Sequence, residues 1–189
     1  LKDSGSCGVY ITPRNISETS ADIGILVKLD KAETAEVKAA ILDPHGNLET
    51  ELFGRTDKDR ITLSGKINCP KLWNGVNSPG LYRAEITLFC NGEPVDSIEQ
   101  EFGIRSYRID ADNGFFLNGK PYPLHGVNYH QDSYESGWAM TGAQRERDYR
   151  IIRDMGCTAV RMAHYQHCDH EYSLCDRLGL CVWTEIGII

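Results

Sequence analysis

The sequence has little that would suit it to a membrane or to a nucleic acid. Its longest apolar runs, such as residues 23–27 and 186–189, are far shorter than the ~20 residues that a membrane-spanning helix requires. No signal-like stretch opens the chain. Basic residues number 20 against 27 acidic ones, a net charge of −7, whereas proteins that bind phosphate backbones carry clustered positive charge. We therefore expect neither a membrane nor a nucleic acid as a partner.

The chain also lacks a cysteine framework. Its seven cysteines are an odd number and include no CxxC pair, and Cys157 and Cys181 stand in apolar contexts where a thiol packs as a small hydrophobic group. This usage favours a reducing compartment. With 189 residues, 41% of them hydrophobic and 25% charged, the chain is expected to be globular and to hold one large domain or two small ones.

The two halves of the sequence differ in composition. Residues 1–106 hold one of the six histidines and six of the seventeen aromatic residues, and residues 107–189 hold the others. We therefore expect two domains, 1–106 and 107–189, with different roles.

The first half has the pattern of an antiparallel β-domain. Turn signals such as Asn91-Gly92 separate short β-rich runs, and residues 82–88 alternate between apolar and polar side chains, as in a strand with one buried face. About seven short strands in ~100 residues predict an immunoglobulin-like β-sandwich, with Trp73 and Tyr82 as core aromatics. The predicted strands are residues 8–12, 21–29, 36–42, 61–67, 81–90 and 95–102.

The second half follows a βαβαβ pattern, in which the strands must run parallel. The first helix opens with Thr141-Gly142-Ala143-Gln144, which fits a capping box, and the helices end at Gly156 and Gly179. The charged residues of the first helix, Arg145 among them, are expected to form a solvated face. The predicted elements are a strand at 124–128, a helix at 143–155, a strand at 157–162, a helix at 169–178 and a strand at 180–184.

Polar side chains gather at the ends of the three predicted parallel strands. Ligands of parallel α/β folds bind beyond the carboxyl ends of the strands, because neighbouring loops converge there. A cluster of hydrogen-bonding groups beside aromatic rings suits a neutral polyhydroxyl ligand such as a sugar. The polar candidates are Asn128, His130, Asp132, Arg161, His164, Tyr165 and Glu185, with Tyr129, Tyr134, Trp138 and Trp183 nearby.

Simpler roles compete with ligand binding at several of these positions. His125 lies inside the first predicted strand, where a buried, hydrogen-bonded histidine is expected. Arg161 either contacts substrate or forms an ion pair with Glu185, and the sequence leaves both open. The motif His164-x2-His167-x2-His170 resembles a metal site, but its spacing does not itself give convergent ligands, so no metal is predicted. A nucleophilic role for Cys168 is disfavoured, because nothing indicates an activated thiolate.

Four motifs occur in a fixed order along the chain. They are Leu72-Trp73 with Leu81-Tyr82, then Gly103-Ile104-Arg105, then Asn118-Gly119-Lys120-Pro121 with Gly126-Val127-Asn128, and last Arg161 with Cys175-Asp176 and Gly179-Leu180. Together they resemble glycoside hydrolase family 2, the β-galactosidase and β-glucuronidase group. The resemblance covers almost the whole chain. It implies an immunoglobulin-like β-sandwich followed by the first βαβαβ portion of a (β/α)8 TIM barrel, a multidomain fold truncated after the third barrel strand.

The resemblance also implies a function for the parent protein. Retaining glycosidases of this kind cleave β-galactosides or related β-glycosides with two carboxyl groups ~5–5.5 Å apart, which the family carries after the fourth and seventh barrel strands. By resemblance, this chain is a fragment that holds neither, needs no cofactor and is inactive alone. Its expected partners are a β-glycoside and the remainder of the parent enzyme. The cytoplasm and the bacterial periplasm both remain open.

The strand-end positions and the resemblance together assign roles to the site residues. Glu185 is expected to support the pocket together with Arg161 and not to act as a catalytic acid. The expected substrate-binding residues are His164, His130, Asp132, Asn128 and Tyr165.

An end after the third barrel strand is expected to leave residues 180–184, or the neighbouring strand, as an unpaired apolar edge. Such an edge pairs with other chains, so a homo-oligomer is expected. A non-catalytic sandwich module for association or carbohydrate binding is the alternative function.

Overall fold

The computed structural model describes residues 1, 5–31 and 34–187, which fold as two compact units. The first unit comprises Leu1–Leu72 and Leu81–Arg105, and the second comprises Trp73–Gly80 and Ser106–Ile189. The segment Trp73–Gly80 therefore belongs to the second unit, although its sequence position lies within the first expected domain. Within the described residues no helix has both the length and the apolar character needed to cross a membrane.

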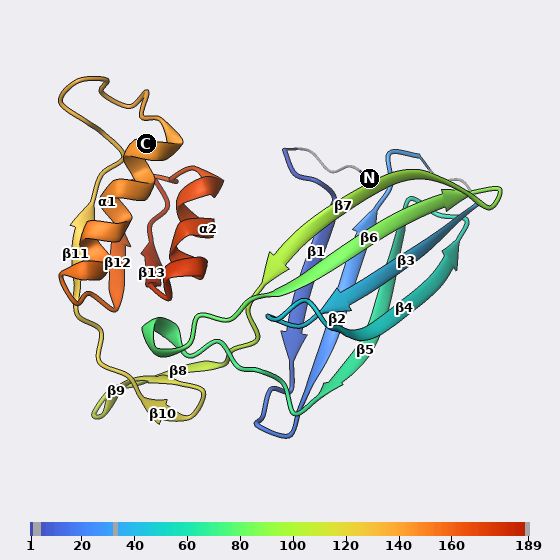
Figure 1. The fold of residues 1–189 in the computed structure, drawn as a ribbon, viewed down its shortest axis with the longest axis horizontal. Coiled ribbons are helices and arrows are strands. Elements are labelled where there is room, and N and C mark those ends of the chain that lie inside the picture. The colour runs from blue at the N-terminus through green and yellow to red at the C-terminus, as the bar shows by residue number, and fades with distance from the viewer. Residues whose placement is uncertain (2–4, 32–33, 188–189) are drawn as a thin grey trace. The chain divides into compact units, whose positions relative to one another are not determined.

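The first unit is a sandwich of two antiparallel sheets (Figure 1). One sheet has the order β1-β2-β5 and the other β4-β3-β6-β7. Alternate side chains of β2, from Ala21 to Val27, are almost fully buried in the core, which Val37, Ile41 and Ile86 of the other sheet share. The strands are β1 (Val9–Arg14), β2 (Ser20–Lys28), β3 (Ala35–Leu42), β4 (Leu48–Thr56), β5 (Arg60–Asn68), β6 (Tyr82–Cys90) and β7 (Glu93–Phe102).

Sequence patterning did not identify β4, the edge strand of its sheet. It pairs with β3 over its whole length, but its large apolar side chains Leu48 and Phe53 are exposed and its inward positions are only half-buried. A strand with so little buried surface carries a weak alternation signal, so tertiary pairing alone reveals it.

The second unit begins with a small antiparallel sheet in the order β10-β9-β8 and continues into a parallel sheet in the order β11-β12-β13. Both pairs of the latter sheet are parallel, so the predicted βαβαβ pattern is confirmed. The elements are η1 (Gly75–Asn77), β8 (Tyr107–Asp110), β9 (Gly114–Leu117), β10 (Lys120–Pro121), β11 (Gly126–Tyr129), α1 (Gly142–Asp154), β12 (Ala159–Met162), α2 (Asp169–Leu178) and β13 (Cys181–Thr184).

Local sequence signals determine where the two helices begin and end. Thr141 and Gln144 form the predicted capping box, and Gly156 and Gly179 both adopt the left-handed backbone after their helices, with φ of 85° and 79°. Beneath the helices a core packs around Tyr149, and it includes Val160 and Leu174. On the edge strand β13 the Trp183 side chain is 64% exposed. Self-association through this edge stays a prediction.

Two residues lie in other surroundings than the sequence predicted. Trp73, expected in the sandwich core, is buried in the second unit, where its indole N–H donates to the Asp176 carbonyl at 2.8 Å. His125 was predicted to be buried within a strand, but β11 begins at Gly126 and His125 is exposed. His125 is exposed because only its backbone contacts the neighbouring chain segment. Its N–H donates to Thr158 Oγ1 at 2.9 Å, while its side chain lies outside the sheet.

Candidate functional site

An arginine on the central parallel strand is the hub of the candidate site. Arg161 of β12 lies opposite Asn128 of β11, and its Nη1 donates to Asn128 Oδ1 at 3.0 Å. Its Nε and Nη2 donate to the same carboxylate oxygen of Glu185, just after β13, at 2.9 and 2.6 Å. The parallel register therefore brings side chains from three successive strands into one hydrogen-bonded group.

His164 extends this group towards solvent. Its Nδ1 lies 2.8 Å from the second carboxylate oxygen of Glu185 and 3.5 Å from Arg161 Nη2. The His164 side chain is nevertheless 64% exposed and that of Arg161 is 36% exposed. The group thus fixes its members by mutual contacts while leaving polar surface for a ligand.

The surroundings of Glu185 keep its carboxyl group ionised. The hydrogen bond from His164 and those from Arg161 lower the pKa of Glu185 below its ordinary value of 4.5. A glycosidase acid must instead hold its proton near neutral pH, which requires a raised pKa. Glu185 therefore suits a binding and orienting role and does not suit proton donation.

Acidification is expected to release these contacts at Glu185. Because the pKa of Glu185 is lower in the folded than in the unfolded chain, its contacts stabilise the folded state fully above pH 4.5. This stabilisation is lost as the pH falls through the lower, folded-state pKa. Following the side-chain carboxyl carbon of Glu185 by NMR should give a titration midpoint below 4.5. A midpoint at or above that value would contradict the ion-paired geometry.

Aromatic side chains lie beside the arginine-centred group. The Tyr165 hydroxyl is 3.4 Å from His130 Nδ1, and the His130 ring contacts the His164 ring edge-on at a centroid distance of 5.5 Å. Trp138 packs against Tyr165 with ring centroids 4.9 Å apart, and its own side chain is largely exposed. Polar donors and aromatic rings together are what a sugar requires, because its hydroxyl groups hydrogen-bond and its ring faces pack on aromatic surfaces.

Six of the seven predicted polar residues are thus linked by contacts. The exception is Asp132, whose backbone N–H donates to the His130 carbonyl at 2.9 Å and whose exposed side chain makes none of these contacts.

Among the aromatic candidates, the prediction that Tyr129 lies near the site residues is wrong. Tyr129 is buried against Tyr149 on the opposite side of the sheet from Asn128, because successive strand residues alternate in direction. Tyr134 is fully exposed.

The three spaced histidines do not converge on a common point. His164 contacts Glu185, His167 is buried against Glu171, and His170 is exposed on α2. Across residues 5–31 and 34–187, no group of three histidine, cysteine or acidic side chains is arranged to hold a metal ion.

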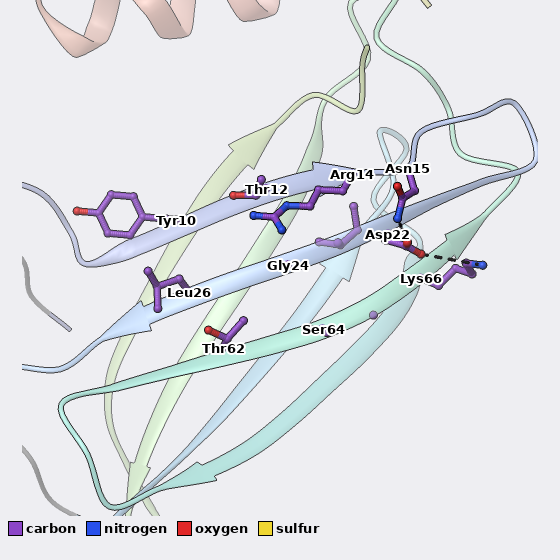
Figure 2. A pocket seen from close by; sticks show the side chains of 12 residues that line it. Tyr10, Thr12, Arg14, Asn15, Asp22, Gly24, Leu26, Thr62, Ser64 and Lys66 are labelled. Carbon is purple, nitrogen blue, oxygen red and sulfur yellow. Dashed lines mark hydrogen bonds and ion pairs between the residues drawn. The ribbon is translucent and has the colours of Figure 1, made fainter.

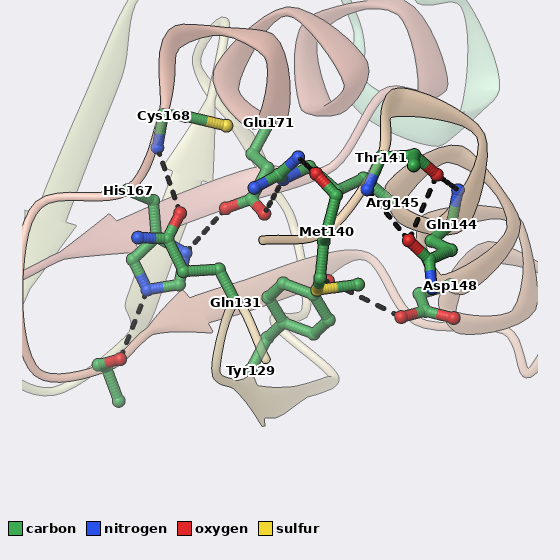
Figure 3. Close-up of polar contacts among 11 residues, drawn as sticks. Tyr129, Gln131, Met140, Thr141, Gln144, Arg145, Asp148, His167, Cys168 and Glu171 are labelled. Carbon is green, nitrogen blue, oxygen red and sulfur yellow. Dashed lines mark hydrogen bonds and ion pairs between the residues drawn. The ribbon is translucent and has the colours of Figure 1, made fainter. Parts of the chain in front are cut away.

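A buried ionic cluster behind the site was missed by the sequence analysis (Figure 3). Arg145, expected on a solvated face, forms an ion pair with Glu171, whose side chain is fully buried. Glu171 in turn bonds His167. The signal lay in α2, where Glu171 stands three and four residues before the buried Leu174 and Cys175, on the apolar stripe of the helix. A charge on such a stripe requires a buried partner.

A separate hollow of about 750 Å³ lies on the sandwich unit, over the outer face of the β1-β2-β5 sheet (Figure 2). Its lining residues stand on three neighbouring strands, with Tyr10 and Arg14 on β1, Gly24 on β2, and Ser64 and Lys66 on β5. Its polar groups bond one another at the edge, with Asn15 donating to Asp22 at 2.7 Å. The hollow is the candidate ligand site for the alternative function, a carbohydrate-binding sandwich module.

Sequence comparison identifies one family over both units. Residues 7–105 match the family described as "Glycosyl hydrolases family 2", and residues 109–189 match "Glycosyl hydrolases family 2, TIM barrel domain". The chain is 36% identical to a β-glucuronidase of Bacteroides fragilis over 99% of its own length and 28% of that protein's. It is 30% identical to a β-galactosidase of Bacteroides ovatus over 96% of its length and 22% of the relative's.

Solved structures agree with the sequence relatives. A Bacteroides uniformis β-glucuronidase, described as covalently bound to cyclophellitol-6-carboxylate aziridine, superimposes with a TM-score of 0.88 at 32% identity. The match covers all of this chain and 24% of that structure. The chain thus spans about a quarter of the length of the proteins it resembles.

Proposed function

Because the chain belongs to family 2 of the glycosyl hydrolases, we propose that it supplies the sandwich and the first three barrel strands of a retaining β-glycosidase. The parent enzyme cleaves β-galactosides, β-glucuronides or related β-glycosides. In this chain the parallel strands carry one wall of the sugar pocket. The observation that carries the proposal is the group of Asn128, Arg161, His164 and Glu185, in which three strand ends present hydrogen-bonding atoms at one edge.

Each residue of this wall has a role that its chemistry supports. Arg161 has five N–H donors, and its contacts with Asn128 and Glu185 fix the guanidinium while leaving a donor for a sugar oxygen. His164 presents its exposed ring edge to a hydroxyl group, with Glu185 setting the ring orientation. His130 and Tyr165 form the neighbouring side of the wall, and Asp132 can reach a ligand from its exposed loop.

Bond cleavage requires chemistry that this group does not provide. A retaining mechanism needs one protonated carboxyl group for the leaving oxygen and one carboxylate that attacks the anomeric carbon. Glu185 is held ionised by two cationic or hydrogen-bonding neighbours and its carboxylate oxygens are both engaged. We therefore propose that the two catalytic carboxyl groups of the parent enzyme come from outside residues 1–189.

Sugar binding by the isolated chain tests the pocket assignment. We expect titration of the ¹⁵N-labelled chain with galactose, glucuronate and their aryl β-glycosides to shift amide resonances at 128–132, 161–165 and 183–187. Shifts confined to β1, β2 and β5 around the hollow of Figure 2 would instead favour the sandwich module for carbohydrate binding. An absence of shifts at both places would contradict either function.

Hydrolysis is expected to be absent from the same preparation. The purified 189-residue chain should release no chromophore from aryl β-glycosides above the buffer rate, because both reacting carboxyl groups are missing from its pocket. Cleavage that a covalent glycosidase inhibitor abolishes would contradict this. A protein that contains this chain together with both carboxyl groups should cleave at least one glycoside of the panel.

A further inference from the structure

The loop that carries His164 and Tyr165 stands on a buried histidine. The His167 side chain is fully buried, and its Nε2 lies 3.1 Å from the carbonyl oxygen of Ala163, the residue directly before His164. The Tyr165 ring stacks on the His167 ring, with centroids 5.0 Å apart and an interplanar angle of 17°. His167 therefore contacts the residue before His164 and also the ring of Tyr165.

The other side of the imidazole is fixed by charge. His167 Nδ1 lies 2.6 Å from one carboxylate oxygen of Glu171, and Arg145 Nε donates to the other oxygen at 3.0 Å. Arg145 also donates to the carbonyl oxygen of Met140, ahead of α1. Figure 3 shows this chain of contacts running from α1 through α2 to the loop.

Hydrogen-bond chemistry fixes the orientation of the His167 ring. A carbonyl oxygen can only accept, so Nε2 donates to Ala163. One proton then lies between Nδ1 and the Glu171 carboxyl group, whichever of the two atoms carries it. Rotation of the ring would break both bonds inside a space closed to water, and an unsatisfied buried polar group is costly. The imidazole is thus held in one orientation.

We infer that His167 is a positioning residue for the sugar site, held in place by the buried Arg145–Glu171 ion pair. The inference rests on the proposed function, because it assigns His164 and Tyr165 to the pocket wall. His167, Glu171 and Arg145 lie behind that wall and touch no sugar. Their effect is to keep the loop at 163–168 in the conformation that presents both rings.

A neutral apolar cluster would fill the same space but would not direct the loop. Replacing a buried ion pair with well-packed hydrophobic residues is often neutral or favourable for stability. The ionic arrangement instead supplies directional bonds to Ala163 and Met140. Its expected benefit is therefore a preorganised loop, which lowers the ordering cost of binding a ligand.

The substitution Glu171→Gln tests the inference with little change in side-chain size. We expect three results: loss of a slowly exchanging, downfield imidazole N–H resonance of His167, faster amide exchange across 163–168, and sugar affinity weakened about tenfold. The matched control is Glu146→Gln, which breaks an exposed ion pair with Arg150 on α1. The control should leave all three observables unchanged.

A second variant covers the case in which Glu171→Gln fails to fold. The double substitution Arg145→Met with Glu171→Leu removes both members of the ion pair together, so no unpaired charge is left in the core of the second unit. It should still loosen the loop and weaken sugar binding about tenfold, because Met140 loses its donor and His167 loses the carboxylate that orients its ring. A purely structural cluster would instead leave affinity unchanged once stability is retained.

The outcomes separate this inference from the proposed function. Wild-type affinity in a folded Glu171→Gln or double variant would overturn the positioning role. If the wild-type chain binds no sugar of the panel, the proposed function fails. The anchoring of the loop is then judged by the His167 resonance and by amide exchange at 163–168. Unchanged exchange in both variants would overturn it.

Discussion

Replacing Gly179 with alanine is expected to unfold the second unit at a much lower temperature. Gly179 ends α2 with φ of 79°, and a Cβ there would lie within 2.6 Å of three backbone atoms of Gly75 and Val76. Alanine thus adds a left-handed backbone penalty of about 1 kcal/mol to a clash that only backbone movement can relieve. Overpacking of this kind costs about 1–3 kcal/mol more.

The chain offers a matched control for this substitution. Gly156, which follows α1, has φ of 85°, but a Cβ there would meet no heavy atom within 4 Å. Gly156→Ala should therefore cost only about 1 kcal/mol, whereas Gly179→Ala should cost about 3 kcal/mol or more. For a unit of under 100 residues these values correspond to falls in Tm of about 5 °C and about 15 °C.

Tryptophan fluorescence is the measurement that isolates this unit. The three tryptophans of the chain, Trp73, Trp138 and Trp183, all lie in the second unit, so their thermal transition reports its unfolding. The first unit should keep its own transition, followed by far-UV circular dichroism. Equal destabilisation by the two glycine substitutions would show that the approach of Gly179 to Gly75 is looser than the structure has it.

Replacing Arg161 with methionine is expected to abolish most sugar binding. Arg161 joins Asn128 to Glu185 and lies beside His164, so its loss frees Asn128 and leaves Glu185 and His164 held only by each other. Hydrogen bonds that involve a charged group contribute about 1.5–3 kcal/mol each, which predicts an affinity loss of about a hundredfold. Isothermal titration with the sugar that binds the wild-type chain measures this loss.

Two further variants make the interpretation specific. Arg161→Lys keeps the charge but loses the planar fork that engages Asn128 and Glu185 together, so it should recover only part of the affinity. Arg150→Met removes an exposed arginine of α1 and should bind as the wild type does. The NMR titration midpoint of Glu185 should rise in Arg161→Met, because that arginine helps to lower the pKa of the carboxyl group. Unchanged affinity despite a raised midpoint would remove Arg161 from the site.

Short-range patterns were sufficient to predict much of the chain. The two-residue alternation of β6 gave the buried face of a sandwich strand, and the capping box at Thr141 with the glycines at 156 and 179 gave the helix limits. Parallel strand order then placed Asn128, Arg161 and Glu185 at one edge, because crossover helices leave no other arrangement. Motif resemblance supplied the family.

Short-range patterns could not predict contacts between distant segments. Trp73 packs in the second unit because its indole N–H donates to the Asp176 carbonyl, 103 residues away in the sequence. The Arg145 side chain is only 14% exposed, because Glu171, on another helix, requires a cation where the helix stripe is apolar. Local spacing determines the direction in which a side chain points from its own helix or strand. The residue that it contacts in that direction depends on how the helices and strands pack together, and only the tertiary structure determines this packing.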